Sequence, residues 1–260
     1  SFWNTSPNRL LPDPRYCYFC QCVSPNSDVM ENTWVAERLN LVAVSPQICR
    51  RPPDWDEQNV VCGFLNPPAG LQSDSLPDGL EEFLSSGPPP VYFTFGSMLM
   101  PNSYAYISAT LAIWREAVER VGCRAIFQVP TDKIEGFSSD DKVFMATWVP
   151  YSQAFPRCEM IVHHGGAGTT QSTLLAGRPS VIVAHVSDQF FWGQELERLG
   201  VASKTLKRKG LKAAHLANGI QNILRNPSIA LVASEIGKRM AMEDGVTTAI
   251  SCFEKRVLGK

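Results

Sequence analysis

The segment from Met160 to Ala184 constrains the fold more than any other part of this chain. It reads as a short apolar strand, a turn at Gly165–Gly166, a helix that begins near Gly168, and a second apolar strand from Pro179. Two apolar strands joined by a helix form a parallel pair, because such a crossover has the required length. The sequence therefore predicts a parallel α/β sheet with a glycine turn at the carboxyl end of one strand.

The turn and the helix start that follows it have the features of an anion site. Glycine lets backbone approach a ligand closely, and the first N–H groups of a helix favour negative charge. His164 and the hydroxyl groups of Thr169 and Thr170 add donors. Asp188 and Gln189 leave the next strand beside the same crevice, where a carboxylate and an amide suit adjacent sugar hydroxyls. These residues together predict a site for a diphosphate and a sugar.

The chain on both sides of this segment alternates between strand and helix patterns. Strands are expected over residues 91–95, 124–129 and 143–147, and helices over 104–121, 211–225, 228–241 and 245–257. Alternation of this kind implies a mostly parallel, doubly wound sheet.

Several segments resemble the donor site of the GT-B UDP-glycosyltransferases. The His163–Thr170 segment is similar to the sterol 3β-glucosyltransferase and bacterial antibiotic glycosyltransferase branch of that superfamily. The remaining matching segments are Arg51–Trp55, Val91–Met98, Trp148–Pro150, Ala176–Pro179, Asp188–Gly193 and Glu243–Val246. Together the matches extend from about residue 40 to residue 260.

The resemblance implies a fold and a domain plan. The fold would be the α/β, Rossmann-like, doubly wound and mostly parallel sheet of the C-terminal half of a GT-B glycosyltransferase. Residues 1–65 would be the remnant of an N-terminal acceptor domain, and residues 66–90 an interdomain linker with a short helix. Residues 91–241 would be the nucleotide-sugar donor-binding domain, and residues 242–260 a C-terminal helix returning towards the N-terminal domain.

The resemblance also implies an activity. It is the inverting, UDP-sugar-dependent transfer of a hexose, with glucose favoured, to a hydroxyl of a lipophilic acceptor such as a sterol. Trp148 would stack on uracil, Val149 would bind the base edge through its backbone, and Asp188 with Gln189 would orient the sugar. The residues assigned to the diphosphate are Ser97, His164, Gly166, Ala167, Gly168, Thr169 and Thr170. His163 would be structural, since adjacent residues of an extended chain point to opposite sides.

No catalytic residue is assigned to this chain, because the general base of the family belongs to the N-terminal domain. The chain would then be a fragment, or would work with a separate acceptor-domain chain. The alternative is a non-catalytic nucleotide-sugar-binding module or a donor-binding subunit; an epimerase or phosphorylase of similar architecture is a third possibility. His185 stands where relatives usually have an aromatic residue, which leaves the donor sugar open.

Composition excludes several other classes of protein. The net charge of −1 gives no whole-chain attraction to nucleic acid, and no apolar run approaches the length of a membrane span. We expect a cytoplasmic protein with at most peripheral membrane contact, with no cofactor and no metal ion. Cys17, Cys20 and Cys22 invite a zinc interpretation, but no second close Cys or His pair completes four ligands. The basic residues from Lys204 to Lys212 are interpreted as a solvated surface rather than a lipid contact.

Overall fold

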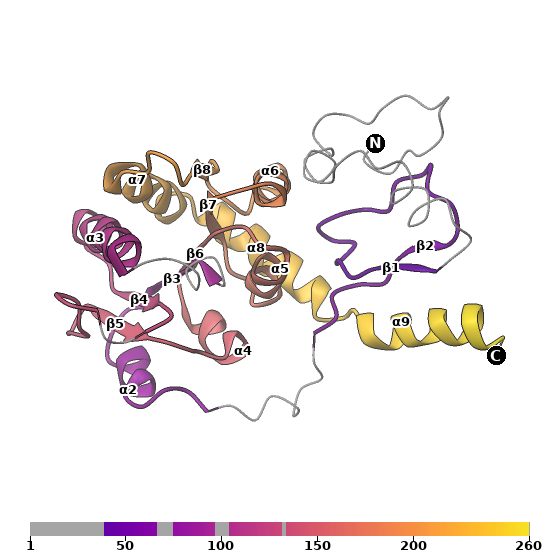
Figure 1. Ribbon diagram of the computed structural model, residues 1–260, viewed down its shortest axis with the longest axis horizontal. Helices are drawn as coiled ribbons and strands as arrows, with labels where there is room; N and C mark the ends of the chain where they lie inside the picture. Colours follow the sequence, from indigo (N-terminus) through magenta and orange to yellow (C-terminus); the bar gives the residue numbers. More distant parts are fainter. Residues whose placement is uncertain (1–38, 67–74, 97–103, 132–133, 260) are drawn as a thin grey trace. The chain divides into compact units, whose positions relative to one another are not determined.

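The computed structural model describes residues 39–66, 75–96, 104–131 and 134–259, which fall into two compact units (Figure 1). Residues 75–238 belong to the larger unit. Residues 39–66 and 239–259 belong to the smaller one. Ser97 and the cysteines at 17, 20 and 22 lie outside the described residues, so the predictions that concern them stay predictions.

A six-stranded parallel sheet forms the centre of the larger unit, in the order β5-β4-β3-β6-β7-β8. Within the unit this corresponds to the strand order 3-2-1-4-5-6 of dinucleotide-binding folds, and the order reverses between β3 and β6. The strands are β3 (Val91–Thr94), β4 (Ala125–Gln128), β5 (Val143–Ala146), β6 (Met160–His163), β7 (Ser180–Ala184) and β8 (Leu206–Lys207). The predicted Rossmann-like, doubly wound α/β fold is confirmed.

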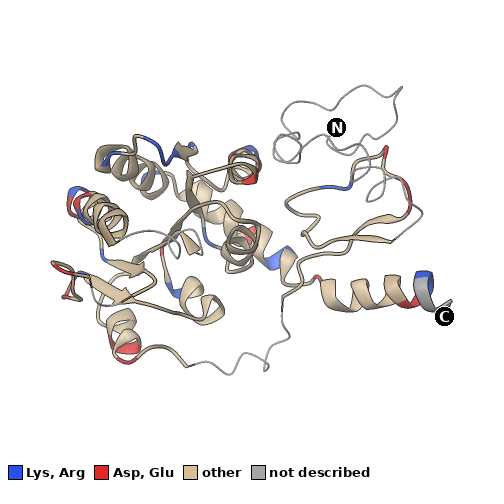
Figure 2. Cartoon of the chain, in the orientation of Figure 1, with Lys and Arg blue, Asp and Glu red and all other residues tan. Residues whose placement is uncertain are grey.

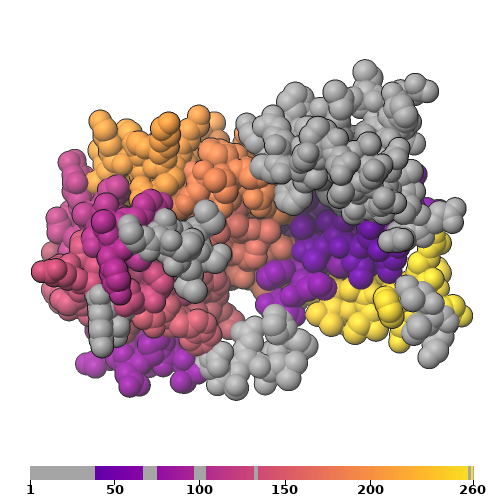
Figure 3. All heavy atoms as spheres, in the orientation of Figure 1, coloured from indigo at the N-terminus to yellow at the C-terminus, as the bar shows by residue number. Residues whose placement is uncertain are grey.

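Helices cover both faces of this sheet. They are α2 (Leu80–Ser85), α3 (Tyr104–Val121), α4 (Tyr151–Ala154) with the 3₁₀ turn η4 (Phe155–Arg157), α5 (Ala167–Leu175), α6 (Asp188–Leu199), α7 (Ala213–Leu224) and α8 (Pro227–Met240). Successive strand residues face opposite sides, so Tyr92 and Phe93 enter different cores. Phe93 packs with α3 and α7, whereas Tyr92 packs with α2 and the α4–η4 segment. Figure 3 shows the outer surface of these elements on one face of the larger unit.

Helix α3 shows how the sequence pattern places a helix on the sheet. Its buried apolar residues recur at helical spacing, and each of the large ones contributes about 1.5–3 kcal/mol by leaving water. In Figure 2 the ribbon of α3 carries both blue and red residues, whereas the charged residues between β8 and α7 are all blue. The buried apolar residues of α3 are Ile107, Leu111, Trp114, Ala117 and Val118.

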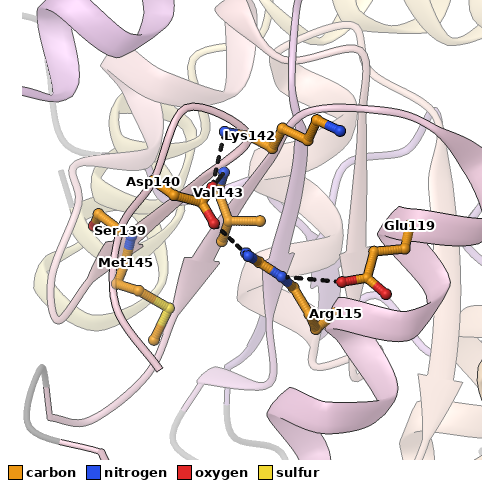
Figure 4. Close-up of polar contacts among 7 residues, drawn as sticks. All are labelled: Arg115, Glu119, Ser139, Asp140, Lys142, Val143 and Met145. Atoms are coloured by element: carbon orange, nitrogen blue, oxygen red, sulfur yellow. Dashed lines mark hydrogen bonds and ion pairs between the residues drawn. The ribbon is translucent and has the colours of Figure 1, made fainter. Parts of the chain in front are cut away.

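Asp140 fixes the start of β5. Its Oδ1 accepts hydrogen bonds from the backbone N–H groups of Lys142 at 2.8 Å and Val143 at 2.7 Å, and its Oδ2 pairs with Arg115 of α3 (Figure 4). Arg115 also contacts Glu119 at 3.4 Å. This cluster lies at the amino end of β5, so it positions the strand but does not contribute to the opposite, carboxyl edge.

The smaller unit combines two segments that are far apart in the sequence. Its parallel strands β1 (Asn40–Val42) and β2 (Asn59–Val61) share the unit with α9 (Gly245–Phe253), which continues into a π-helical turn over Glu254–Leu258. Ser45 Oγ donates to Glu243 Oε1 at 2.8 Å. Arg51 donates to backbone carbonyls of its own loop, including that of Asn59 at 3.1 Å. The segments around Arg51 and Glu243 therefore have a structural explanation, while the predicted domain limits stay a prediction.

The larger unit contains elements that the sequence did not predict. The strands expected over 91–95, 124–129 and 143–147 and the helices expected over 104–121, 211–225 and 228–241 are present, with bounds that shift by two residues at most. The helix expected over 245–257 ends at Phe253 and continues as a π-helical turn. Helices α4 and α6 and the two-residue strand β8 are not among the elements expected from the sequence. Within the described ranges, no helix combines the length and the apolar character that a membrane crossing needs.

Candidate functional site

The turn between β6 and α5 lies at the carboxyl edge of the sheet, beside the point where the strand order reverses. Gly165 has φ +88°, and a Cβ there would lie 2.9 Å from the carbonyl oxygen of Gln189. The turn thus packs against the first residues of α6. Gly166 caps α5 and its carbonyl accepts the N–H of Thr170 at 2.9 Å. The N–H groups of the residues before Thr170 have no partner within the helix, so this helix start is suited to an anion.

His163 is a structural residue, as predicted. Its side chain is fully buried, and its Nδ1 accepts the N–H of Gly165 at 3.2 Å. The ring proton is therefore on Nε2, which donates to Ser180 Oγ at 3.1 Å. Burial and the neighbouring His164 hold the pKa of His163 well below its usual range. His163 thus joins β6 to β7 and supports the glycine turn.

His164 lies between two glycines. Its side chain is 7% exposed, and a Cβ at Gly166 would lie 2.3 Å from its Nε2, while a Cβ at Gly96 would lie 2.9 Å from its Cε1. Its Nδ1 is buried and has no hydrogen-bond partner among the described residues. Burial lowers the pKa of His164 to about 4. The imidazole is therefore neutral at pH 7, with hydrogen-bonding capacity left for a ligand.

Gly168 differs from the other glycines of the turn. It lies in the first turn of α5, is exposed, and a Cβ there would meet nothing within 4 Å. Neither packing nor a positive φ explains a glycine at this position. Glycine lowers helix stability by roughly 0.5–1 kcal/mol relative to alanine, so close approach of a ligand to the backbone is a physical reason to have it here.

The two predicted threonine hydroxyls are placed differently. The side chain of Thr169 lies beside the hydroxyl of Tyr151 and lowers the pKa of that hydroxyl. Thr170 is 0% exposed, and its Oγ1 is buried with no partner among the described residues. Its hydroxyl therefore faces the interior in this conformation. Ala167, the first residue of α5, contributes its backbone position. The roles of these residues towards a diphosphate stay predictions.

Asp188 and Gln189, which were predicted to bind the sugar, are the first two residues of α6. Gln189 is 4% exposed, and its Oε1 accepts the N–H groups of His185 at 2.7 Å and Val186 at 3.2 Å. The amide oxygen thus holds the loop after β7, and a sugar contact by Gln189 stays a prediction. Asp188 follows Ser187, whose φ of 45° and ψ of −120° belong to a region that favours glycine.

The segment predicted to hold a base follows β5. The Trp148 side chain is 49% exposed, so a face for stacking is accessible, whereas Val149 and Pro150 are buried. Tyr151 begins α4 directly after them and reaches Thr169 of α5. Helix α4 therefore joins the Trp148 segment to α5, although β5 and β6 are separated by two strands.

Two residues without a ligand role in the sequence-based prediction, His185 and Arg208, lie at the same edge. The His185 ring packs edge-on against Phe95 at 4.6 Å between centroids and lies 6.5 Å from the ring of His164. Burial, and then the charge of Arg208, lower the pKa of His185 to about 4. Arg208 itself donates to Tyr106 Oη at 2.9 Å.

Among the described residues, no group of three or more His, Cys, Asp and Glu side chains could hold a metal ion. The absence of a metal and of a cofactor stays a prediction.

Residues 116–251 match the family described as erythromycin biosynthesis protein CIII-like, C-terminal domain. A sterol 3-beta-glucosyltransferase of Arabidopsis thaliana is 33% identical over 220 residues, which cover 82% of this chain and 34% of that protein. The chain thus spans about a third of the length of this relative.

Solved glycosyltransferases share the fold. The glycosyltransferase of kitacinnamycin has a TM-score of 0.66 at 20% identity, over 85% of this chain and 55% of that chain. The glycosyltransferase VinC, in complex with dTDP, has a TM-score of 0.56 at 24% identity, over 70% of this chain and 44% of that chain. These neighbours are GT-B glycosyltransferases, which confirms the predicted resemblance to the C-terminal half of that fold.

Proposed function

Because the chain belongs to the erythromycin biosynthesis protein CIII-like C-terminal domain family, we propose that it forms the donor-binding part of a UDP-sugar-dependent glycosyltransferase. The donor would lie across the carboxyl edge of the six-stranded sheet. The base would stack on Trp148, the diphosphate would lie at the start of α5, and the sugar would lie near Asp188 and Gln189.

One observation carries the proposal: a buried histidine and an open helix start meet at the switch point of the sheet. His164 Nδ1 has no partner among the described residues, and Gly168 leaves open space at the first turn of α5. A helix N-terminus stabilises a nearby anion by roughly 0.3–1 kcal/mol at exposed sites and up to ~2 kcal/mol when partly buried. Both features face the edge where nucleotides bind in sheets of this order.

The reaction would proceed with inversion at the anomeric carbon. An acceptor hydroxyl attacks that carbon and gives its proton to a general base, while the bond from the carbon to the diphosphate oxygen breaks and UDP leaves with the electron pair. His164 and the N–H groups of α5 would stabilise the negative charge that develops on the diphosphate. None of the four histidines precedes residue 163, and the base is expected from an acceptor domain.

We further propose UDP-glucose as the donor and a sterol-like alcohol as the acceptor. The name of the Arabidopsis relative supports a glucosyl donor and a sterol-like acceptor. Because VinC was solved in complex with dTDP, dTDP is the natural competitor to compare with UDP. Calorimetric titration of UDP, UDP-glucose and dTDP into the chain tests the donor site. Binding of UDP and UDP-glucose more tightly than dTDP is expected. No binding of any of the three nucleotides would refute the proposal.

A donor-binding subunit without activity of its own is the second candidate, because the residues that would bind the donor do not include a general base. UDP release from UDP-glucose, measured with and without a sterol acceptor, separates the two. Release that requires the sterol supports a transferase acting alone. Donor binding without release supports the subunit.

A further inference from the structure

A chain of hydroxyl groups runs beneath the proposed donor site. The backbone N–H of Gly96 donates to Thr94 Oγ1 at 3.0 Å, and Thr94 Oγ1 lies 3.3 Å from Tyr151 Oη. Tyr151 Oη donates to Gln128 Oε1 at 3.0 Å, which also accepts from Tyr92 Oη at 3.2 Å. The chain therefore joins β3, β4 and α4.

The direction of these hydrogen bonds follows from their donors. Tyr151 has a single hydroxyl proton and gives it to Gln128, so the hydroxyl of Thr94 donates to Tyr151 while accepting from Gly96. The side chain of Thr169 in α5 also lies beside the Tyr151 hydroxyl and lowers its pKa. Burial raises the pKa of Tyr151, whereas the contacts with Thr94 and Thr169 lower it. Hydrogen bonds aligned in this way polarise and strengthen one another.

Tyr151 stands where the two halves of the proposed site meet. It follows the Trp148–Pro150 segment directly, which would hold the base. It lies beside Thr169 of the helix that would hold the diphosphate. Through Thr94 it holds the backbone of Gly96, where a Cβ would lie 2.9 Å from His164 Cε1. The ring itself is held by stacking on Phe155, with centroids 4.1 Å apart. The ring therefore packs in the core, while the hydroxyl makes the hydrogen bonds, and the hydroxyl can be removed without removing the ring.

We propose that the Tyr151 hydroxyl is a positioning group that fixes the base-binding segment relative to the diphosphate turn. It acts through Thr94 and Thr169, and it need not touch the nucleotide. A site must hold its groups within about 0.5 Å to use their binding energy together. The affinity of a ligand that binds both halves, such as UDP, should depend on how the two halves are placed. The affinity of a ligand that binds only the base half, such as uridine, should not. This inference rests on the proposed donor site.

The test compares Tyr151→Phe with Tyr92→Phe. Both variants keep the ring and lose one hydrogen bond to the same Gln128 oxygen, but only Tyr151 reaches α5. UDP affinity is measured by calorimetry and uridine affinity by chemical-shift titration. Tyr151→Phe should weaken UDP binding roughly tenfold, the effect of losing a hydrogen bond or two, and change uridine binding less than twofold. Tyr92→Phe should leave both ligands within twofold of wild type.

A second variant keeps the inference testable if Tyr151→Phe does not fold. Thr94→Val interrupts the same chain and should reproduce the selective loss of UDP affinity, with Thr94→Ser restoring it. In the double variant the two losses should not add. Equal losses for UDP and uridine, or unchanged UDP binding in both single variants, would overturn the inference and leave the donor site intact. Failure of the wild type to bind UDP would overturn the proposed function and this inference with it.

Discussion

Replacing Gly168 by alanine should separate stability from function. The residue is in the first turn of α5 and a Cβ would meet nothing within 4 Å. Alanine is better than glycine in a helix by roughly 0.5–1 kcal/mol. The melting temperature of Gly168→Ala should therefore rise by about 2–4 °C for each kcal/mol gained, given the size of the unit.

Binding should change in the opposite direction. The added methyl group would occupy the space through which a diphosphate approaches the N–H groups of the helix start. Losing one or two hydrogen bonds to a charged group costs about 1.5–3 kcal/mol each, so UDP affinity should fall at least tenfold. Thermal unfolding and calorimetry on the same preparation measure both quantities.

Gly166→Ala is the informative contrast. A Cβ at Gly166 would lie 2.3 Å from His164 Nε2, so this variant should lose both stability and binding. The reasoning would be refuted if Gly168→Ala bound UDP within twofold of wild type, because the open space would then not be part of the nucleotide site.

Three further predictions concern single residues. The pKa of His164 is lowered from its usual 6.5 to about 4, so protonation of this residue favours the unfolded chain. The contribution of neutral His164 to the free energy of unfolding is complete above about pH 6.5 and should fall by about 2 kcal/mol by pH 5. Urea unfolding should show a smaller pH dependence in His164→Ala, and equal dependence would contradict this. Thr170→Val removes a buried, unpartnered hydroxyl and should keep or raise stability by about 1 kcal/mol without changing UDP affinity; a tenfold loss of affinity would show that this hydroxyl turns to the ligand. Ser187→Gly should be more stable than Ser187→Ala by about 1 kcal/mol in denaturant unfolding, because only glycine relaxes the φ of 45°; equal stabilities would exclude strain.

Periodicity explains why most of the fold could be predicted. The apolar runs at β3 and β6 are buried on both faces, as a central parallel strand requires. The spacing of apolar residues in α3 marks its buried face. Strand β8 has only two residues, Leu206 and Lys207, which is too short to give a pattern. Helix α6 is absent from the expected elements although Asp188 begins it and Gly200 follows it, the two signals that could have indicated its ends.

The parts of the candidate site that could be predicted are those whose residues are neighbours in the sequence. The glycine turn and His164 are adjacent in sequence, and the opposite orientation of His163 follows from extended backbone. The inward hydroxyl of Thr170 depends on helix rotation against a core that local sequence does not show. The hydrogen bonds of Tyr151 with Gln128 and Thr94 join residues 23 and 57 positions apart, so only the folded chain brings them together. The turn at Ser187 carries no sequence signal, because serine occupies a position that favours glycine.

Calorimetric titration of UDP-glucose into wild type, His164→Ala and His215→Ala tests the central claim most directly. His215 is an exposed histidine of α7 and serves as a matched control for the same substitution. The account predicts that His164→Ala weakens binding tenfold or more, since it removes a buried hydrogen-bonding group at the diphosphate turn, and that His215→Ala binds as the wild type does. Equal affinities for all three proteins would contradict a donor site built around His164.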